Sequence, residues 1–258
     1  MKPVNNIRIF RWAALASVFL LLPGAFSRAG DDGVELLRAV INKSAAVRAI
    51  DAEITQYIDT EGKPREVFRG RYRADRQGRF RIDYTVPSKQ TVLNDGRGFY
   101  WYYHEDRLLY RMAKTADGPT SPAFNPVKEL EGGMEGDRFT VLDLGPRLYG
   151  FFGMGRHLAV TDREKALRVD MLVDPGKKVV LKKTVRGRTG MELMKERYEH
   201  YRTVSGCFFP GRVTVTVRTG RGITRNITEY GAIKLNSAVT PAVFRLELPP
   251  DVTVKDMP

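Results

Sequence analysis

Apolar and polar residues alternate with a period of two along residues 52–112. The pattern is clear where Phe80, Ile82 and Tyr84 alternate with charged residues. This period is typical of β-strands with one buried and one solvated face. A slip of one residue would bury the charges, so the pattern also fixes which face is apolar. The strands predicted here are 52–58, 68–74, 80–86, 90–94, 99–104 and 108–112.

The same period returns after residue 166. Val213, Val215 and Val217 alternate with polar residues, and glycine-containing turns at 174–176 and 219–222 favour hairpins. Residues 191–201 would also fit a helix. The strands predicted in this part are 166–173, 178–186, 193–204, 211–218, 223–232 and 243–248.

Three segments have a helical or mixed character. In residues 32–50 Val34, Leu37 and Ile41 recur at helical spacing, which predicts an amphipathic helix. A short helix is also predicted over 126–131. Residues 144–158 are rich in Leu, Phe and Met but are interrupted by Gly150, Gly153 and Gly155, so we expect a short, loosely held apolar helix there.

About ten or eleven antiparallel strands with one apolar face each must bury that face. They can close into a barrel or curl around something, with the helical segments covering the open side. The predicted fold class is therefore mainly β, of the α+β type. Bulky rings at many inward positions and the glycine-containing apolar segment leave two interpretations open, a core filled by side chains and a core with a cavity.

The N-terminus has the features of an export signal. Lys2, Arg8 and Arg11 precede a short apolar run, and Ser27-Arg28-Ala29 offers small residues for cleavage. This arrangement predicts a secretory signal peptide over 1–29 and one domain over 30–258. A retained membrane anchor is the alternative, although the run is shorter than a spanning helix needs. Cleavage would remove four basic residues and lower the formal charge from +13 to +9.

The chemistry-bearing residues indicate no enzyme. The three histidines (His104, His157 and His200) lie far apart in sequence without metal-ligand spacing, and the serines lack a nucleophile motif. Cys207 is the single cysteine, which excludes an internal disulfide and is expected to serve packing. We predict no catalytic residues, no metal and no cofactor. For an exported basic protein, anionic lipid headgroups or acidic partner surfaces are better candidates than nucleic acid.

Several short segments form a recognisable series along the chain: Ile54-Thr55-Gln56, Gly70-Arg71-Tyr72-Arg73-Ala74, Gly78 to Tyr84 with Pro87, Asn94-Asp95-Gly96-Arg97 with 99–103, Leu235-Asn236, Phe244, Leu246, Pro249-Pro250 and Val252-Thr253-Val254. This series resembles the LolA-like outer-membrane lipoprotein carriers of the periplasm, and it directly covers about half of the chain after residue 29. Two features depart from that pattern: the family's Arg-Pro is Arg76-Gln77 here, and 187–211 is longer.

The resemblance implies an unclosed antiparallel barrel with helices as a lid over an apolar cavity. It implies a monomeric periplasmic carrier that shields the acyl chains of a lipoprotein or lipid on the way to the outer membrane, with inner- and outer-membrane transfer proteins as partners. An arginine near the second strand's turn would hold the lid closed, and Arg76 and Arg79 are the candidates. We expect the cavity to be lined by Phe68, Tyr72, Phe80, Ile82, Tyr84, Phe99, Trp101 and Tyr103 and covered by Leu148, Phe151, Phe152 and Met154.

Two other functions remain as alternatives at this stage. A related regulatory domain would sense lipid or lipoprotein and signal through protein contacts. An enzyme acting on envelope lipid would need a catalytic set, which the sequence does not provide.

Overall fold

The computed structural model describes residues 26–27, 31–113, 127, 139–150, 153–163, 167–219 and 222–257. Its elements up to residue 113 are β1 (Phe26–Ser27), α1 (Asp31–Ala45), β2 (Ala49–Thr60), β3 (Glu66–Asp75), β4 (Phe80–Val86), β5 (Gln90–Asn94), β6 (Gly98–Tyr103) and β7 (Leu108–Ala113). Those that follow are β8 (Phe139–Tyr149), β9 (Gly153–Asp162), β10 (Leu167–Asp174), β11 (Val179–Arg186), β12 (Glu192–Glu199), β13 (Arg202–Val204), β14 (Cys207–Phe209), β15 (Arg212–Thr219), β16 (Gly222–Leu235), the 3-10 helix η4 (Pro241–Phe244) and β17 (Thr253–Asp256).

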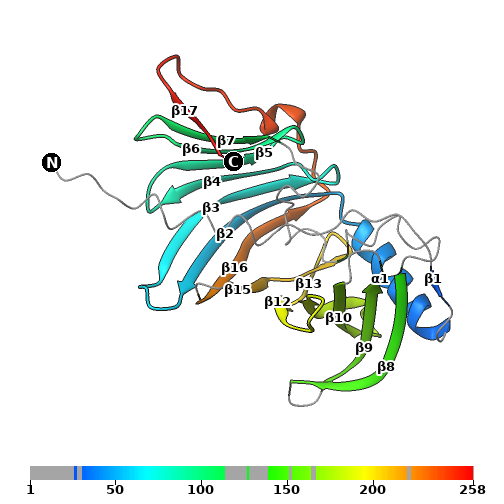
Figure 1. Ribbon diagram of the computed structural model, residues 1–258. Coiled ribbons are helices and arrows are strands. Elements are labelled where there is room, and N and C mark those ends of the chain that lie inside the picture. The colour runs from blue at the N-terminus through cyan, green and yellow to red at the C-terminus, as the bar shows by residue number, and fades with distance from the viewer. Residues whose placement is uncertain are drawn as a thin grey trace.

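Fifteen of these strands form one long unclosed sheet (Figure 1), which confirms the predicted fold class. The strand order is β1-β8-β9-β10-β11-β12-β15-β16-β2-β3-β4-β5-β6-β7-β17, and β13 pairs with β14 separately. Neighbouring strands are antiparallel except at the two edges, where β1 joins β8 and β17 joins β7 in parallel. The pairing of β2 with β16 brings the two halves of the chain together in the middle of the sheet.

One face of this sheet, which we call the inner face, carries the core. Cross-strand register places Ile54 opposite Tyr230, Val213 opposite Tyr198, and Met171 opposite Leu158, so the apolar positions follow one face from end to end. These side chains belong to a single hydrophobic cluster. The period of two in the sequence predicted this correctly, because each strand has only one face on which it can bury its apolar residues.

Helix α1 packs on the inner face at the β8–β11 end of the sheet (Figure 1). Leu37, Val40 and Ile41 are buried at helical spacing and join the same core cluster. The helix begins at Asp31 as expected, but it ends at Ala45 rather than residue 50. The predicted residues 46–50 instead turn the chain into β2, because Ile50 pairs with Ala74 of β3.

The helix predicted over 144–158 is wrong, because this segment forms parts of β8 and β9. Leu148 and Met154 lie opposite each other in the ladder, and Gly150 has a φ of +62° between the two strands. A Cβ added to Gly155 would lie 2.7 Å from Leu172 Cδ1, so that glycine permits a close approach. The apolar residues looked like one helical stripe because neither the pairing nor this approach is visible in the sequence.

Two other strand predictions needed correction. Residues 243–248 form no strand; the chain makes η4 there and reaches β17 only after Pro249 and Pro250, which supply no ladder donors. The strand predicted over 193–204 ends at Glu199, since His200 has a φ of +55°, and 202–204 form the separate strand β13. The alternative helix over 191–201 does not form. The count of ten or eleven was low because β8, β9 and the short strands β1, β13, β14 and β17 were not predicted as separate strands.

Gly70 allows β3 and β4 to approach each other at a register shift. A Cβ there would lie 2.3 Å from the Asp83 carbonyl oxygen and 2.8 Å from Tyr84 Cα, both backbone atoms that cannot rotate away. We expect Gly70→Ala to lower the free energy of unfolding by about 2 to 3 kcal/mol through overpacking. Gly231→Ala is the matched control, because its Cβ would come no closer than 3.7 Å to Glu53. Urea denaturation that ranked the two variants equally would contradict this account.

Within the described ranges, no helix combines the length and apolar character that crossing a bilayer would require. Most of the predicted signal peptide and the predicted helix over 126–131 lie outside the described residues, apart from 26–27 and Val127. Cleavage after Ala29 stays a prediction, and it would remove β1 from the sheet.

Candidate functional site

The eight residues predicted to line a cavity come together on strands β3, β4 and β6, with β5 between β4 and β6. They belong to one core cluster on the inner face, which we call the aromatic wall, and their rings meet in three groups. The contacts, given as distances between ring centroids, are Phe68–Tyr84 at 5.5 Å, Tyr72–Phe80 at 6.5 Å, Phe80–Phe99 at 6.4 Å and Trp101–Tyr103 at 5.4 Å. Ile82 packs against the same cluster.

Two polar atoms of the aromatic wall have hydrogen-bond partners. The Trp101 indole N–H donates to Gln90 Oε1 at 2.9 Å, and the Tyr84 hydroxyl donates to Gln56 Oε1. Burial raises the pKa of the Tyr84 phenol. The wall therefore offers a neutral and largely apolar surface on which these two polar groups are satisfied.

In this arrangement the wall is covered. Six of its side chains are less than a tenth exposed, and Ile82 and Tyr103 are half-buried. Tyr230 packs edge-on against both Tyr72 and Phe209, and Val127 is completely buried in the same cluster. A cavity along this face thus stays a prediction that requires these covering groups to move. The prediction did not include Tyr230 among the groups that cover the wall, although its place in the alternating run 223–232 could have indicated an inward position.

The predicted lid residues do not cover this wall in the described chain. Leu148 and Met154 form a cross-strand pair near the end of the β8–β9 hairpin and are 71% and 54% exposed. Phe151 and Phe152 lie outside the described residues. The role of all four as a lid remains a prediction.

The two gating candidates differ in their surroundings. Arg76 is exposed in the β3–β4 turn. Arg79 is half-buried, forms an ion pair with Asp75 at 2.5 Å, and lies 4.8 Å from the ring centroid of Phe244 in η4. Among the described contacts, Arg79 reaches the C-terminal segment and Arg76 does not. This contact can help to hold η4 in place, whereas a role of either arginine in gating the inner face stays a prediction.

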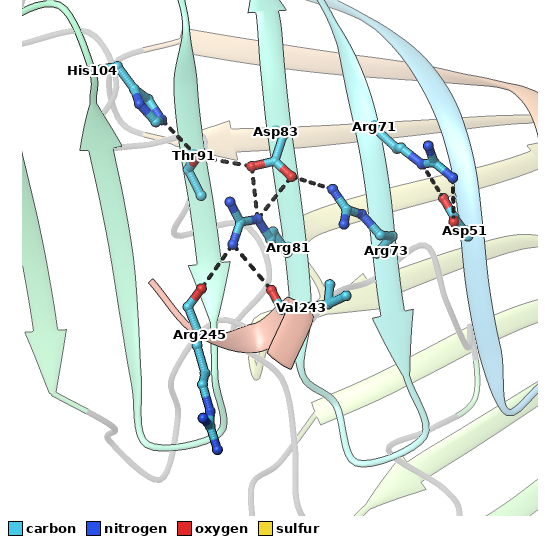
Figure 2. Close-up of polar contacts among 9 residues, drawn as sticks. All are labelled: Asp51, Arg71, Arg73, Arg81, Asp83, Thr91, His104, Val243 and Arg245. Atoms are coloured by element: carbon cyan, nitrogen blue, oxygen red, sulfur yellow. Dashed lines mark hydrogen bonds and ion pairs between the residues drawn. The ribbon is translucent and has the colours of Figure 1, made fainter. Parts of the chain in front are cut away.

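A polar network covers the opposite, outer face of β2–β5 (Figure 2). Asp83 accepts hydrogen bonds from Arg73, Arg81 and Thr91, and Thr91 also contacts His104 Nε2 at 3.0 Å. The Arg81 guanidinium further donates to the carbonyl oxygens of Val243 at 3.2 Å and Arg245 at 2.9 Å (Figure 2). This network fixes η4 against the outer face of β4. Apart from the buried Arg73 Nε, which has no hydrogen-bond partner among the described residues, its charged groups are paired with one another or with backbone carbonyls, which favours a structural role over a catalytic one.

A groove of about 910 Å³ lies on the outer face of the other half of the sheet, over β8–β12. We call it the basic groove, because its lining contains six basic side chains and one carboxylate, Asp170. The basic residues are Arg147, Arg168, Lys182, Arg186, Arg188 and Arg197. Tyr149 and Leu172 add an apolar part to its floor.

The described residues contain no cluster of His, Cys, Asp and Glu that could hold a metal ion. Cys207 is half-buried and packs against the main core, as expected of a packing residue. The described chain thus has an apolar, covered surface on one face and a basic groove on the other, whereas its side chains assemble no recognisable catalytic set.

Comparison with known proteins places the sequence near one group of curated proteins. The chain is 34% identical over 104 residues to an outer-membrane lipoprotein carrier protein of Methylococcus capsulatus, which is 39% of this chain and 47% of that protein. The chain thus spans about half the length of this curated relative. No protein-family model matches the chain.

Solved structures share the fold at low sequence identity. A DUF1329 family protein from Desulfovibrio piger superposes with a TM-score of 0.61 at 13% identity, covering 83% of this chain and 96% of that one. LolA superfamily protein NE2245 from Nitrosomonas europaea gives 0.54 at 13% identity, covering 81% and 97%. Both likenesses concern the architecture of the unclosed sheet.

Proposed function

Since the chain is a divergent member of the LolA-like group, we propose that it is a carrier that shields acyl chains of a lipid or lipoprotein against the inner aromatic wall. The observation that supports this most is the wall itself, where Phe68, Tyr72, Phe80, Phe99 and Trp101 form one neutral apolar surface. Such a surface suits a hydrocarbon chain, which needs exclusion of water and no directional bonds.

The energetic case for a carrier is simple. Moving an acyl chain of about 16 carbons into water costs roughly 0.8 kcal/mol per methylene, or about 12 kcal/mol in total. Transfer between two apolar environments avoids most of this cost, so small rearrangements can bias loading and release. In this proposal the acyl chain takes the place of the groups that now cover the wall, among them Val127 and Tyr230.

We place the carrier in the periplasm as a monomer whose signal peptide has been removed. Its proposed partners are an acylated lipoprotein or lipid and the membrane proteins that deliver and receive it. Catalysis plays no part in this proposal, because a hydrocarbon chain can be bound and released without any covalent step.

Trp101 provides a direct test. The chain has two tryptophans, and Trp12 lies in the predicted signal peptide, so Trp101 is the sole tryptophan of a chain that starts at residue 30. We expect a fatty acid brominated along its chain to quench Trp101 fluorescence in a saturable way, because the heavy atoms must lie against the wall. The same fatty acid without bromine is the control for quenching. Saturable binding without quenching would contradict the proposed location.

Two substitutions in β6 compare the face that carries the wall with the opposite face. We expect Trp101→Ala to weaken binding of a radiolabelled fatty acid at least tenfold, because the acyl chain loses its largest ring contact. Tyr100→Ala is the matched control, since Tyr100 neighbours Trp101 in β6 but points to the outer face. Equally tight binding by the Trp101 variant and wild type would reject the lining.

A further inference from the structure

The basic groove brings like charges together across adjacent strands. Lys182 of β11 lies directly opposite Arg197 of β12, and Arg168 of β10 lies directly opposite Arg186 of β11. Like charges in such positions destabilise a sheet unless something compensates them. Asp170 compensates only the second pair, because Arg168 Nε and Arg186 Nε contact its carboxylate at 2.8 and 3.0 Å.

The first pair has no comparable compensation. Across the described chain, no carboxylate lies within ion-pair distance of Lys182 or Arg147, and Arg197 reaches Glu199 only at 3.6 Å. Burial lowers the pKa of Lys182, and the positive charges of Lys195 and Arg147 lower it further. The Lys182 end of the groove is thus a place where a bound anion would relieve existing repulsion.

The shape and donors of this end suit a phosphate group. Arg147 and Arg197 carry planar guanidinium forks that match phosphate oxygens, and Lys182 adds a compact charge between them. The groove's volume of about 910 Å³ falls within the range of small-ligand sites.

Exposed apolar side chains lie at the tip of the β8–β9 hairpin beside this end. Leu148 borders the groove and is 71% exposed, and Met154, its cross-strand partner, is 54% exposed. Strand alternation directs both side chains to the face opposite Arg147 and Tyr149, so they project from the edge of the groove rather than into it. Tyr149 and Leu172 continue the apolar surface onto the floor. Cations flanking protruding apolar residues are the combination that binds the headgroup layer of an anionic bilayer.

We propose that the basic groove binds the phosphate headgroups of anionic phospholipids at a membrane surface, with Leu148 and Met154 entering the interfacial layer. The groove occupies the outer face, whereas the aromatic wall and α1 occupy the inner face. Membrane docking through the groove therefore leaves the acyl-binding wall free. The proposal is independent of the carrier function and goes beyond it.

The test uses the chain from residue 30 onward and vesicles of phosphatidylcholine, with or without phosphatidylglycerol. We expect cosedimentation with the anionic vesicles and little with the neutral ones. Lys182→Gln combined with Arg197→Gln should weaken this binding roughly thirty-fold, from the roughly fivefold that each surface cation contributes. Lys63→Gln with Arg69→Gln removes the same charge from exposed positions on the other half of the sheet and should retain most of the binding.

The melting temperature and a second pair of substitutions show whether a loss of vesicle binding comes from the groove or from unfolding. Neutralising the repelling pair should leave the melting temperature unchanged or higher, so lost vesicle binding would not reflect unfolding. Leu148→Ser with Met154→Ser should also weaken binding, as expected of membrane contact. Equal binding to both kinds of vesicle, or equal losses in the groove and control variants, would overturn the proposal.

Competition with free phosphate distinguishes a phospholipid headgroup from a soluble phosphate, the two possible sources of a bound phosphate group. Competition by inorganic phosphate beyond that of sodium chloride at matched ionic strength would indicate a site for a soluble anion and would overturn the membrane assignment. Quenching of Trp101 by brominated fatty acid should persist in the groove variant. If brominated fatty acid quenched Trp101 neither in wild type nor in the groove variant, the carrier function would be contradicted and the membrane proposal would be unaffected. The two proposals can therefore fail separately.

Discussion

Replacing Lys183 by methionine is expected to lower the free energy of unfolding by about 3 to 5 kcal/mol. Lys183 and Glu196 face each other across β11 and β12 on the inner face, with Nζ 3.1 Å from Oε2. Their side chains are 5% and 1% exposed, so the ion pair is removed from water. Removing one partner leaves the other charge buried without compensation, which costs far more than the pair itself contributes.

The surroundings of Glu196 sharpen this expectation. Its Oε2 accepts the Tyr198 hydroxyl, while its Oε1 has no hydrogen-bond partner among the described residues. The carboxylate therefore depends strongly on Lys183. For a domain of this size the loss corresponds to a fall in melting temperature of about 10 °C, measurable by circular dichroism.

A double substitution supplies the control. Lys183→Met combined with Glu196→Gln removes both charges, and the glutamine can still accept the Tyr198 hydroxyl. We expect most of the lost stability to return, because neither charge is then buried alone. If the double variant were as unstable as the sum of the single variants, the ion pair would not be the cause. Arg65→Met, which removes an exposed partner of Asp59, should cost less than about 1 kcal/mol.

Phe244→Ala is expected to cost about 3 to 5 kcal/mol, the second large effect. Phe244 is 3% exposed in η4 and lies beneath the Arg79 guanidinium on the outer side of the sheet. The residues after η4 continue to β17, whose pairing with β7 is supported by the Arg111–Asp256 ion pair at 2.8 Å. The ring therefore anchors the middle of a segment that crosses the outer face.

The measurement can separate local release from general unfolding. Hydrogen exchange should rise in β17 and in the β7 amides that it protects, more than in β2 or β16 at the centre of the sheet. Leu248→Ala is the control in the same segment, because Leu248 is 40% exposed and should change stability by less than about 1 kcal/mol. Unchanged protection in β17 of the Phe244 variant would show that the segment is held elsewhere.

Arg79 links this result to the gating prediction. The family resemblance suggested an arginine that closes a lid, and the observed contacts connect Arg79 with Asp75 and Phe244. If Arg79→Ala alters hydrogen exchange in η4 but leaves fatty-acid binding unchanged, its role is to hold the C-terminal segment. A faster release of fatty acid would support gating.

The alternation of apolar and polar residues was enough to predict the class of fold and the inner face of most strands. Phe68, Tyr72 and Tyr84 could be assigned to that face because a period of two leaves each strand a single choice. Their grouping on β3 and β4 followed as well, since short turns pair consecutive strands. The eight wall residues were found for this local reason.

The remaining features became visible in the folded chain alone, because they depend on pairings and contacts that the local sequence pattern does not specify. The buried Lys183–Glu196 pair, the contact of Arg81 with the carbonyls of Val243 and Arg245, and the β8–β9 hairpin could not be read from local periodicity. The basic groove arises in the same way, since Arg147, Lys182 and Arg197 come from three strands. Periodicity reports the face on which a side chain lies, whereas register and strand order decide its neighbours.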